Sequence, residues 1–220
     1  DGLRIDAANN NYGALPGNNT TFMNTDICCA AVNRGVSGQG MFVPANITGV
    51  KIIHSKIHGN GTAGAGVGNT GGHGFYWQGS NGLIDSSEVY GNGGLGIQMY
   101  CNVGADLCTG GMSGNIIRNS YFHDNGVFGG LSTTAILIYS QPGASSNLIH
   151  HNIVSNNRGR GISIRANGGA PAIVYNNTVY GNNSAGFSLN NGSGHIVKNN
   201  IFYKNGIVAL AGTYDDGVGG

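Results

Sequence analysis

A short repeat that recurs along most of the chain is the feature that most constrains its fold. Six segments align on an asparagine that follows two short apolar runs: VKIIHSKIHGNG, LIDSSEVYGNG, IIRNSYFHDNG, LIHHNIVSNN, IVYNNTVYGNN and IVKNNIFYKNG. The anchoring residues are Asn60, Asn92, Asn125, Asn156, Asn182 and Asn205. Each segment continues into a motif of small, apolar, any and apolar residues: GFYW, GIQM, AILI, GISI, GFSL and, more loosely, IVAL. We expect the anchoring asparagines at turns, with their amides bonded to the next unit.

The pattern inside each unit indicates β-strands, because apolar residues alternate with a period of two and glycine interrupts every run. One such unit cannot bury its apolar side alone, so the units must stack, with equivalent residues about 4.8 Å apart. The expected core columns are Ile52, Ile84, Ile117, Ile149, Val174 and Val197; Ile57, Val89, Phe122, Val154, Val179 and Phe202; and Met41, Phe75, Ile97, Ile136, Ile162, Phe187 and Val208. Trp77 is expected to pack inward with Met99, Ile138, Ile164, Leu189 and Leu210.

Composition limits the possible partners. The chain has 42 glycines, 10 basic and 9 acidic residues and a net charge of +1. This balance gives no electrostatic reason to expect a nucleic acid or an acidic membrane as partner. We expect one domain over residues 1–220, in which 1–39 form an irregular N-terminal coil or cap, 40–210 the regular coils and 211–220 a C-terminal tail.

The repeats resemble those of right-handed parallel β-helix proteins of the pectate-lyase-like superfamily. The resemblance covers roughly residues 40–210 and implies an all-β solenoid of about seven coils, with insertions on the central coils. That superfamily includes extracellular polysaccharide lyases, hydrolases, epimerases, adhesins and phage tailspikes, so the fold alone does not specify a reaction. Because the chain also starts with Asp and has an even number of cysteines, we expect an extracellular or cell-surface protein.

A hydrolase of the polygalacturonase type is disfavoured. The chain resembles that family at Asn24-Thr25-Asp26 and at Gly72-His73-Gly74, but inverting hydrolysis needs a pair of carboxyl groups. Residues 27–71 contain no Asp or Glu, and the family's Arg-Ile-Lys motif is missing. The stretch between the two motifs therefore lacks the acidic pair that the family places there.

Cleavage or epimerisation of an acidic polysaccharide by a lyase-type β-elimination fits the residues better. It needs a base for the proton beside a carboxylate and a cation to stabilise the enolate, roles that Tyr, His and Arg can fill. Alternation predicts a site on the outward face of the GFYW/GIQM/AILI/GISI sheet, between insertions at 61–72, 101–113, 126–134 and 140–147. The expected catalytic residues are His73, Tyr100, Tyr139 and Arg165, and the expected substrate-binding residues are Tyr76, Gln78 and Gln98.

An alternative remains open for these residues. The protein can be a non-catalytic glycan-binding, adhesin or structural β-helix, in which the exposed aromatics only stabilise the sheet.

A second outward column carries charges of both signs. It can be a solvated face with weak surface pairs, and its members are Ile53, Asp85, Arg118, His150, Tyr175 and Lys198.

Metal ions have little support in the sequence. We expect no metal site or cofactor, because the acidic residues do not cluster as Ca²⁺ requires, although calcium is common among extracellular β-helix lyases. The seven histidines have no spacing diagnostic of zinc, although the pairs His54/His58 and His150/His151 are worth checking in a structure.

The four cysteines allow several pairings. Cys101 and Cys108 bracket a short insertion, and we expect a disulfide between them. Adjacent cysteines seldom bond to each other, so the pairing of Cys28 and Cys29 stays open, and cross-pairing with Cys101 or Cys108 is the alternative.

Overall fold

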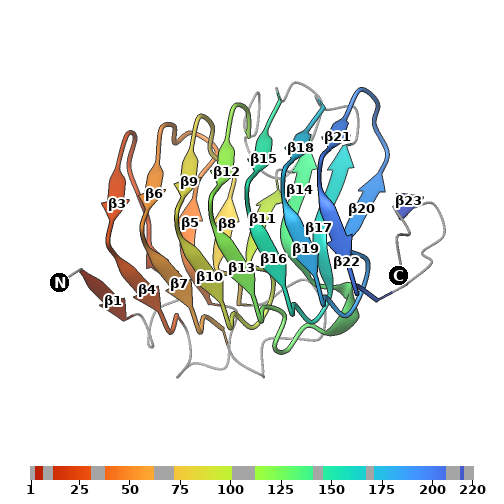
Figure 1. Cartoon of the computed structure of the whole chain (residues 1–220). Helices are drawn as coiled ribbons and strands as arrows, with labels where there is room; N and C mark the ends of the chain where they lie inside the picture. Colours follow the sequence, from red (N-terminus) through yellow and green to blue (C-terminus); the bar gives the residue numbers. More distant parts are fainter. Residues whose placement is uncertain are drawn as a thin grey trace.

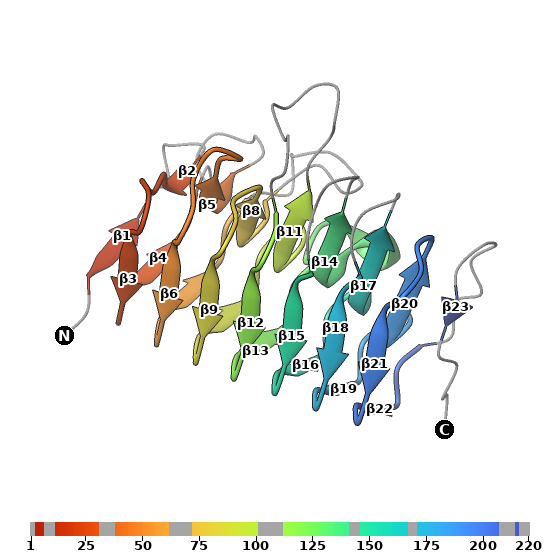
Figure 2. The ribbon, with the colours of Figure 1, turned by 90° about the horizontal axis from the view of Figure 1, so that it is seen from above.

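The fold is that of a parallel β-helix, as the repeats predicted (Figure 1). This computed structural model describes residues 3–6, 12–30, 38–61, 72–100, 112–140, 146–166, 171–206 and 214–215. The strands form three long sheets of 8, 8 and 7 strands, in which every described pairing but one is parallel. The stacked strands run side by side from the N-terminal to the C-terminal end of the molecule (Figure 2).

We name the sheets A, B and C. Sheet A contains β1 (Arg4–Asp6), β4 (Asp26–Cys28), β7 (Lys56–His58), β10 (Glu88–Tyr90), β13 (Tyr121–His123), β16 (Ile153–Ser155), β19 (Thr178–Tyr180) and β22 (Ile201–Tyr203). Sheet B contains β2 (Tyr12–Ala14), β5 (Gln39–Val43), β8 (Phe75–Trp77), β11 (Ile97–Tyr100), β14 (Thr134–Ser140), β17 (Arg160–Ala166), β20 (Phe187–Asn190) and the antiparallel β23 (Tyr214–Asp215). Sheet C contains β3 (Thr21–Met23), β6 (Lys51–Ile53), β9 (Leu83–Asp85), β12 (Ile116–Arg118), β15 (Leu148–His150), β18 (Ile173–Tyr175) and β21 (Ile196–Lys198).

Each coil passes through sheet C, then sheet A, then sheet B. Two residues separate every sheet C strand from the next sheet A strand, and the first of the two has a positive φ, as at Asn24, His54 and His151. Asparagine tolerates this left-handed conformation better than most residues, which explains its frequency at this corner. The connections that lead into and out of sheet B are much more variable in length. One of them contains the short 3₁₀ helix η1 (Gly130–Ser132).

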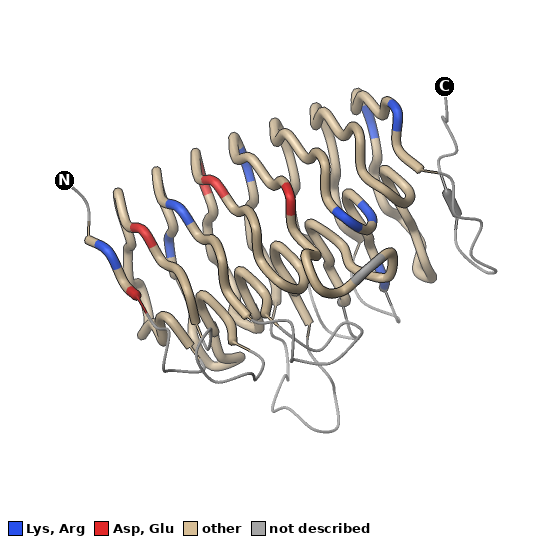
Figure 3. The backbone as a smooth tube through the Cα atoms, turned by 90° about the horizontal axis from the view of Figure 1, so that it is seen from below, with Lys and Arg blue, Asp and Glu red and all other residues tan. Residues whose placement is uncertain are grey.

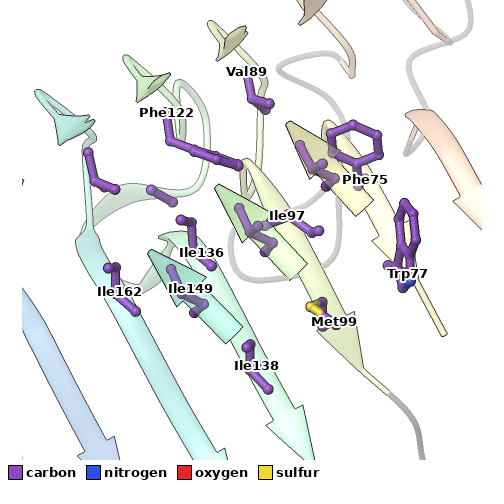
Figure 4. Close-up of a cluster of buried hydrophobic side chains, with 14 of the residues drawn as sticks. Phe75, Trp77, Val89, Ile97, Met99, Phe122, Ile136, Ile138, Ile149 and Ile162 are labelled. Carbon is purple, nitrogen blue, oxygen red and sulfur yellow. The ribbon is translucent and has the colours of Figure 1, made fainter. Parts of the chain in front are cut away.

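The core lies between the three sheets and follows the predicted columns. Ile84, Ile117 and Ile149 are paired in register on neighbouring strands and are at most 2% exposed. Figure 4 shows the same stacking in side chains such as Ile97 and Ile136. Trp77 is also buried, and its Nε1 lies 3.2 Å from both the Gly79 carbonyl oxygen and Asn115 Oδ1. The only tryptophan is therefore a core residue, as expected.

The last coil is more open than the columns predicted. Val197 is 39% exposed and Phe202 is only partly buried, whereas the preceding members of their columns are buried. Val197 lies in β21, the terminal strand of sheet C, and therefore has a stacked neighbour on one side only. The expected core residues Val208 and Leu210 lie outside the described residues.

Asparagine amides form a buried ladder from coil to coil, as predicted, with one correction. Asn92 donates from Nδ2 to Asn125 Oδ1 at 2.8 Å, and Asn125 in turn donates to Asn157 at 3.0 Å. The fourth member is thus Asn157, whereas the alignment placed Asn156 there. Asn156 instead occupies the preceding left-handed position (φ 54°), which glycine fills in other coils, such as Gly181. The doubled asparagine in SNN made the two registers look equivalent in the sequence.

The segment expected to form an irregular cap, residues 1–39, contains β1 to β4, and each of these strands pairs in parallel with the following coil. No helix in the described part of the chain is long and apolar enough to cross a membrane.

Candidate functional site

The outer face of sheet B gathers most of the residues that the sequence singled out. Tyr100 pairs in register with Tyr139, and Tyr139 pairs with Arg165, so the three residues lie on successive strands. Gln98 and Tyr76 are also register partners, and Gln98 lies two residues before Tyr100 on the same face of β11. All five side chains are half-buried, while their neighbours along each strand point into the core. The predicted register therefore holds along this face.

Aromatic rings cover part of this face. The Tyr100 and Tyr139 ring centroids lie 4.9 Å apart, and the Phe42 ring stacks between those of Tyr12 and Tyr76 with centroids 5.4 Å apart on each side. Flat apolar rings at this spacing offer a surface on which sugar rings can pack. The same contacts also stabilise neighbouring strands of the sheet.

His73 and Gln78 were expected in an accessible site, but both are buried. His73 is 2% exposed, and its Nδ1 accepts a hydrogen bond from the backbone N–H of Leu95 at 3.0 Å. Gln78 is 5% exposed and its Nε2 lies 3.4 Å from the Tyr76 hydroxyl. His73 is thus a buried residue that ties two coils together, and Gln78 lies against Tyr76 rather than forming an open surface.

Other outward positions of sheet B are also covered. Leu137, Ser163 and Ser188 continue the column of Tyr76 and Gln98, yet each is at most 5% exposed. The accessible part of the face is therefore restricted to the neighbourhood of the half-buried tyrosines and Arg165. Most of the insertions expected to form its walls, including 62–71 and 101–111, lie outside the described residues.

The outward positions of β8, β11, β14 and β17 include no carboxylate among their described side chains. Within the described residues, these strands therefore offer neither the acidic pair of a glycoside hydrolase nor carboxylate ligands of the kind that Ca²⁺ prefers. Its chemical groups are phenols, amides, hydroxyls and one guanidinium.

Sheet A presents a second polar face, which the sequence reasoning missed. Acidic and basic residues alternate there in register on consecutive coils, as Arg4, Asp26, Lys56 and Glu88 (Figure 3). The Lys56 ammonium lies 3.7 Å from a Glu88 oxygen. Two shallow depressions of about 340 and 350 Å³ lie on either side of Lys56. The sequence signal for this face was the core column that contains Ile57 and Val89. The residues before and after each member of that column point outward, because side chains alternate along a strand.

Two imidazoles on the sheet A face contact three carboxylates. His58 Nε2 lies 2.8 Å from Asp26, while His123 contacts Glu88 at 3.0 Å through Nε2 and Asp124 at 2.7 Å through Nδ1. The Tyr90 ring stacks between the two imidazoles, with centroids 4.7 and 5.1 Å away.

The pKa of Tyr90 is raised by burial and by the nearby Glu88 carboxylate. The pKa of Tyr121 is raised mainly by burial as well. Both phenols are therefore held in their neutral form, and the Tyr90 ring lies between the two imidazoles as a neutral group.

Sheet C carries the predicted mixed column in register, from Asp85 through Arg118 and His150 to Tyr175. Arg118 donates from Nε and Nη2 to one Asp85 oxygen at 3.0 and 2.7 Å. Burial alone would raise the pKa of Asp85, but hydrogen bonds from Arg118, Asn119 and Ser86 hold it below its usual 3.8. The column is thus a row of interacting side chains on the surface of sheet C, in which Arg118 is 40% exposed.

Adjacent Cys28 and Cys29 form a disulfide, which decides the pairing that the sequence left open. Cross-pairing with Cys101 or Cys108 does not occur, and the disulfide expected between those two lies outside the described residues. Together with Asp6, the Cys28–Cys29 pair is the one group of three possible metal ligands within 4.8 Å of one another in the described part of the chain. Because both sulfur atoms are bonded to each other, this group does not offer thiolate ligands.

Comparison with protein families identifies the fold independently. The model for the right handed beta helix region matches residues 8–170 and 45–218. A search among curated proteins found no significant match, and a search among solved structures found none either. The two family matches together span nearly the whole chain and agree with its three parallel sheets. The chain therefore belongs to the right-handed β-helix family.

Proposed function

We propose that this protein binds an acidic polysaccharide on the outer face of sheet B and cleaves it by β-elimination. The in-register row of Tyr100, Tyr139 and Arg165 is the observation that supports the proposal. It combines two phenol groups with a guanidinium on three successive strands, and neighbouring strands lie about 4.8 Å apart. One sugar unit and its carboxylate can contact all three side chains.

Each residue has a distinct role in the proposed reaction. Arg165 pairs with the uronic acid carboxylate through two hydrogen bonds and stabilises the negative charge that develops there. Tyr139, which lies between Arg165 and Tyr100, acts in its phenolate form and takes the proton from the carbon beside that carboxylate, and after the reaction it passes this proton to Tyr100. The electron pair forms a carbon–carbon double bond as the glycosidic carbon–oxygen bond breaks, and Tyr100 donates a proton to the departing oxygen.

The remaining expected residues serve binding in this proposal. Tyr76 provides a half-buried ring surface, Gln78 contacts its hydroxyl, and Gln98 offers an amide to sugar hydroxyls. His73 has no part in the reaction, because it is buried and bonded to a backbone amide. We also propose an extracellular or cell-surface location, which fits a disulfide-containing protein that acts on polysaccharide.

Non-catalytic glycan binding is the second candidate. The observation that favours it is the direct ring contact between Tyr100 and Tyr139, together with the stacked rings of Tyr12, Phe42 and Tyr76. Such a row can hold a chain of sugars without any proton transfer.

A substrate panel distinguishes the two candidates. The protein is incubated with pectins, alginates and glycosaminoglycans, and the products are assayed for ultraviolet-absorbing unsaturated ends and for new reducing ends. The lyase proposal predicts both signals on at least one acidic polymer. Binding to a polymer without new ends supports the second candidate, and new reducing ends without unsaturation would contradict β-elimination.

Variants then test the site. Tyr139→Phe and Arg165→Ala are each expected to lower activity, or binding in the second candidate, at least about tenfold, which corresponds to about 1.4 kcal/mol. Tyr180→Phe and Arg4→Ala on sheet A are the matched controls and should retain full function. Unchanged function in both sheet B variants, with folding intact by circular dichroism, would rule out this site.

A further inference from the structure

We propose that His150 and His151, at the corner between sheets C and A, form a binding site for a divalent transition-metal ion of the copper type. Their Nδ1 atoms lie 2.8 Å apart and face each other. The site is separate from the sheet B face, and the proposal does not depend on the polysaccharide function.

The surroundings of this pair differ from those of the other histidines. His58 and His123 are bonded to carboxylates, while His73 and His195 each accept a backbone N–H through Nδ1. Each of these four rings therefore has at least one nitrogen bonded to a carboxylate or to a backbone N–H. In contrast, the Nδ1 atoms of His150 and His151 contact only each other.

Neighbouring residues hold both rings in place. The His150 ring stacks on Tyr175, with centroids 4.8 Å apart and planes 8° from parallel. His151 lies at the left-handed corner position, φ 56°, and its Nε2 contacts the Asn176 side-chain amide at 3.2 Å. Such outer contacts orient imidazole ligands and select their tautomer in metal sites. The pair is therefore largely positioned before any ion binds.

The nearest guanidinium does not rule out a bound cation. Arg118 pairs in register with His150, but it is bound to Asp85 through two short hydrogen bonds, so its charge is largely balanced there.

Ligand chemistry indicates the class of ion. The 2.8 Å between the two Nδ1 atoms is the length of the hydrogen bond that joins the rings, so a bound ion would replace this hydrogen bond. Imidazole nitrogens suit Zn²⁺, Cu²⁺ and Ni²⁺, and Cu²⁺ binds most tightly among these ions.

Binding requires a local rearrangement without loss of a proton from the pair. One Nδ1 carries the hydrogen that lies between the two rings, and this hydrogen moves to Nε2 of the same ring so that both Nδ1 lone pairs become free. For His151, the amide of Asn176 can rotate so that its oxygen accepts the relocated hydrogen. Small rotations of the rings then direct both lone pairs at the ion, and water completes the coordination.

Calorimetric titration of the metal-free protein with CuCl₂, in a weakly coordinating buffer at neutral pH, tests the site. We expect one equivalent of Cu²⁺ per chain, with Ni²⁺ binding more weakly and Zn²⁺ more weakly than Cu²⁺. His151→Asn and His150→Phe are each expected to weaken Cu²⁺ binding at least about tenfold, since each removes one of two ligands. Cu²⁺ should also raise the Tm of the wild type more than that of either variant.

Both substitutions preserve the fold by design. Asparagine occupies the equivalent corner position at Asn24, Asn119 and Asn199, and phenylalanine retains a ring to stack on Tyr175. His54→Asn is the matched control, because it removes a corner histidine that has no second histidine beside it, and it should bind Cu²⁺ like the wild type. Equal Cu²⁺ affinity in the wild type and both pair variants would overturn the proposal, and tighter binding of Zn²⁺ than of Cu²⁺ would overturn the assignment to copper.

Discussion

At the residue scale, Asp85 shows how a surface charge becomes part of the structure. Its side chain is 14% exposed, and hydrogen bonds reach it from Arg118, Asn119 and Ser86. These bonds favour the ionised carboxylate and outweigh the effect of burial, so the pKa of Asp85 is lowered from 3.8. A carboxyl group with a lowered pKa stabilises the folded state above its unfolded pKa, and that contribution disappears as the pH falls through the folded pKa.

Arg118→Met is expected to reduce the free energy of unfolding by about 1 kcal/mol at neutral pH, a value kept modest because Arg118 is 40% exposed. The difference from the wild type should shrink as the pH drops below about 3.8, because the protonated Asp85 no longer benefits from the guanidinium. Urea unfolding at neutral and acidic pH measures both values. A difference that stays constant with pH would mean that Arg118 acts through packing instead of charge.

At the scale of the elements, polar ladders hold neighbouring coils in register. A second ladder, which the alignment did not reveal, runs along the corner between sheets C and A. It begins with Ser55, Ser87 and Ser120, continues through Asn152 to Asn177, and each member accepts a hydrogen bond from the backbone N–H of the preceding coil. Buried polar groups of this kind are costly when one partner is removed. The ladders therefore fix which residues of consecutive coils are paired. The apolar columns alone specify this pairing less strictly, because one apolar side chain can replace another.

Asn125→Ala is expected to lower the free energy of unfolding by about 3 kcal/mol or more. It removes three buried hydrogen bonds of the Asn125 side chain, those to the Val89 carbonyl, to the Asn157 oxygen and from the Asn92 amide. Asn205→Ala removes the same amide from the partly exposed end of the ladder, where water can replace it, and should cost only about 1 kcal/mol. Denaturant unfolding of both variants provides the comparison, and equal losses would show that burial does not set the cost.

At the scale of the whole molecule, each coil contacts mainly the coil before it and the coil after it. Sheets A, B and C each gain one in-register strand per coil along the chain. Stability in such a solenoid is approximately a sum of unit and neighbour terms. A complete coil can therefore be removed without disturbing the pairing of the rest.

Deletion of residues 153–177 is expected to give a folded, shorter β-helix. It removes β16, β17 and β18, one strand from each sheet. Asn152 then precedes Thr178 directly and takes the position of Asn177, its equivalent in the next coil. The variant should keep a β-rich circular dichroism spectrum and a cooperative unfolding transition, but it should lose polysaccharide cleavage because Arg165 is absent.

A deletion of residues 153–172 is the control for this experiment. It joins Asn152, which normally precedes a sheet A strand, to Ile173, the first residue of a sheet C strand. A sheet C strand then stands where a sheet A strand is needed, and the later strands no longer fall in register. This variant should not fold. If both deletions fold equally well, the register of the coils does not govern the stability of the molecule.

The alternation of apolar residues and its recurrence along the chain determined the all-β stacked architecture and most core positions. Ile84, Ile117 and Trp77 could be placed inside because strand periodicity is a local property and the repeat sets which residues share a column. The same reasoning placed Tyr100, Tyr139 and Arg165 on successive strands of one outward face.

Only the tertiary structure decided which outward residues are accessible and which groups meet across coils. His73 and Ser163 follow the repeat pattern, yet both are buried, because accessibility depends on segments far away in sequence. The contact between His58 and Asp26 joins residues 32 positions apart, and its length depends on side-chain rotamers as well as on strand register. A repeating sequence specifies which strands are neighbours, but the packing of side chains and connections around each face sets the chemistry that this face can perform.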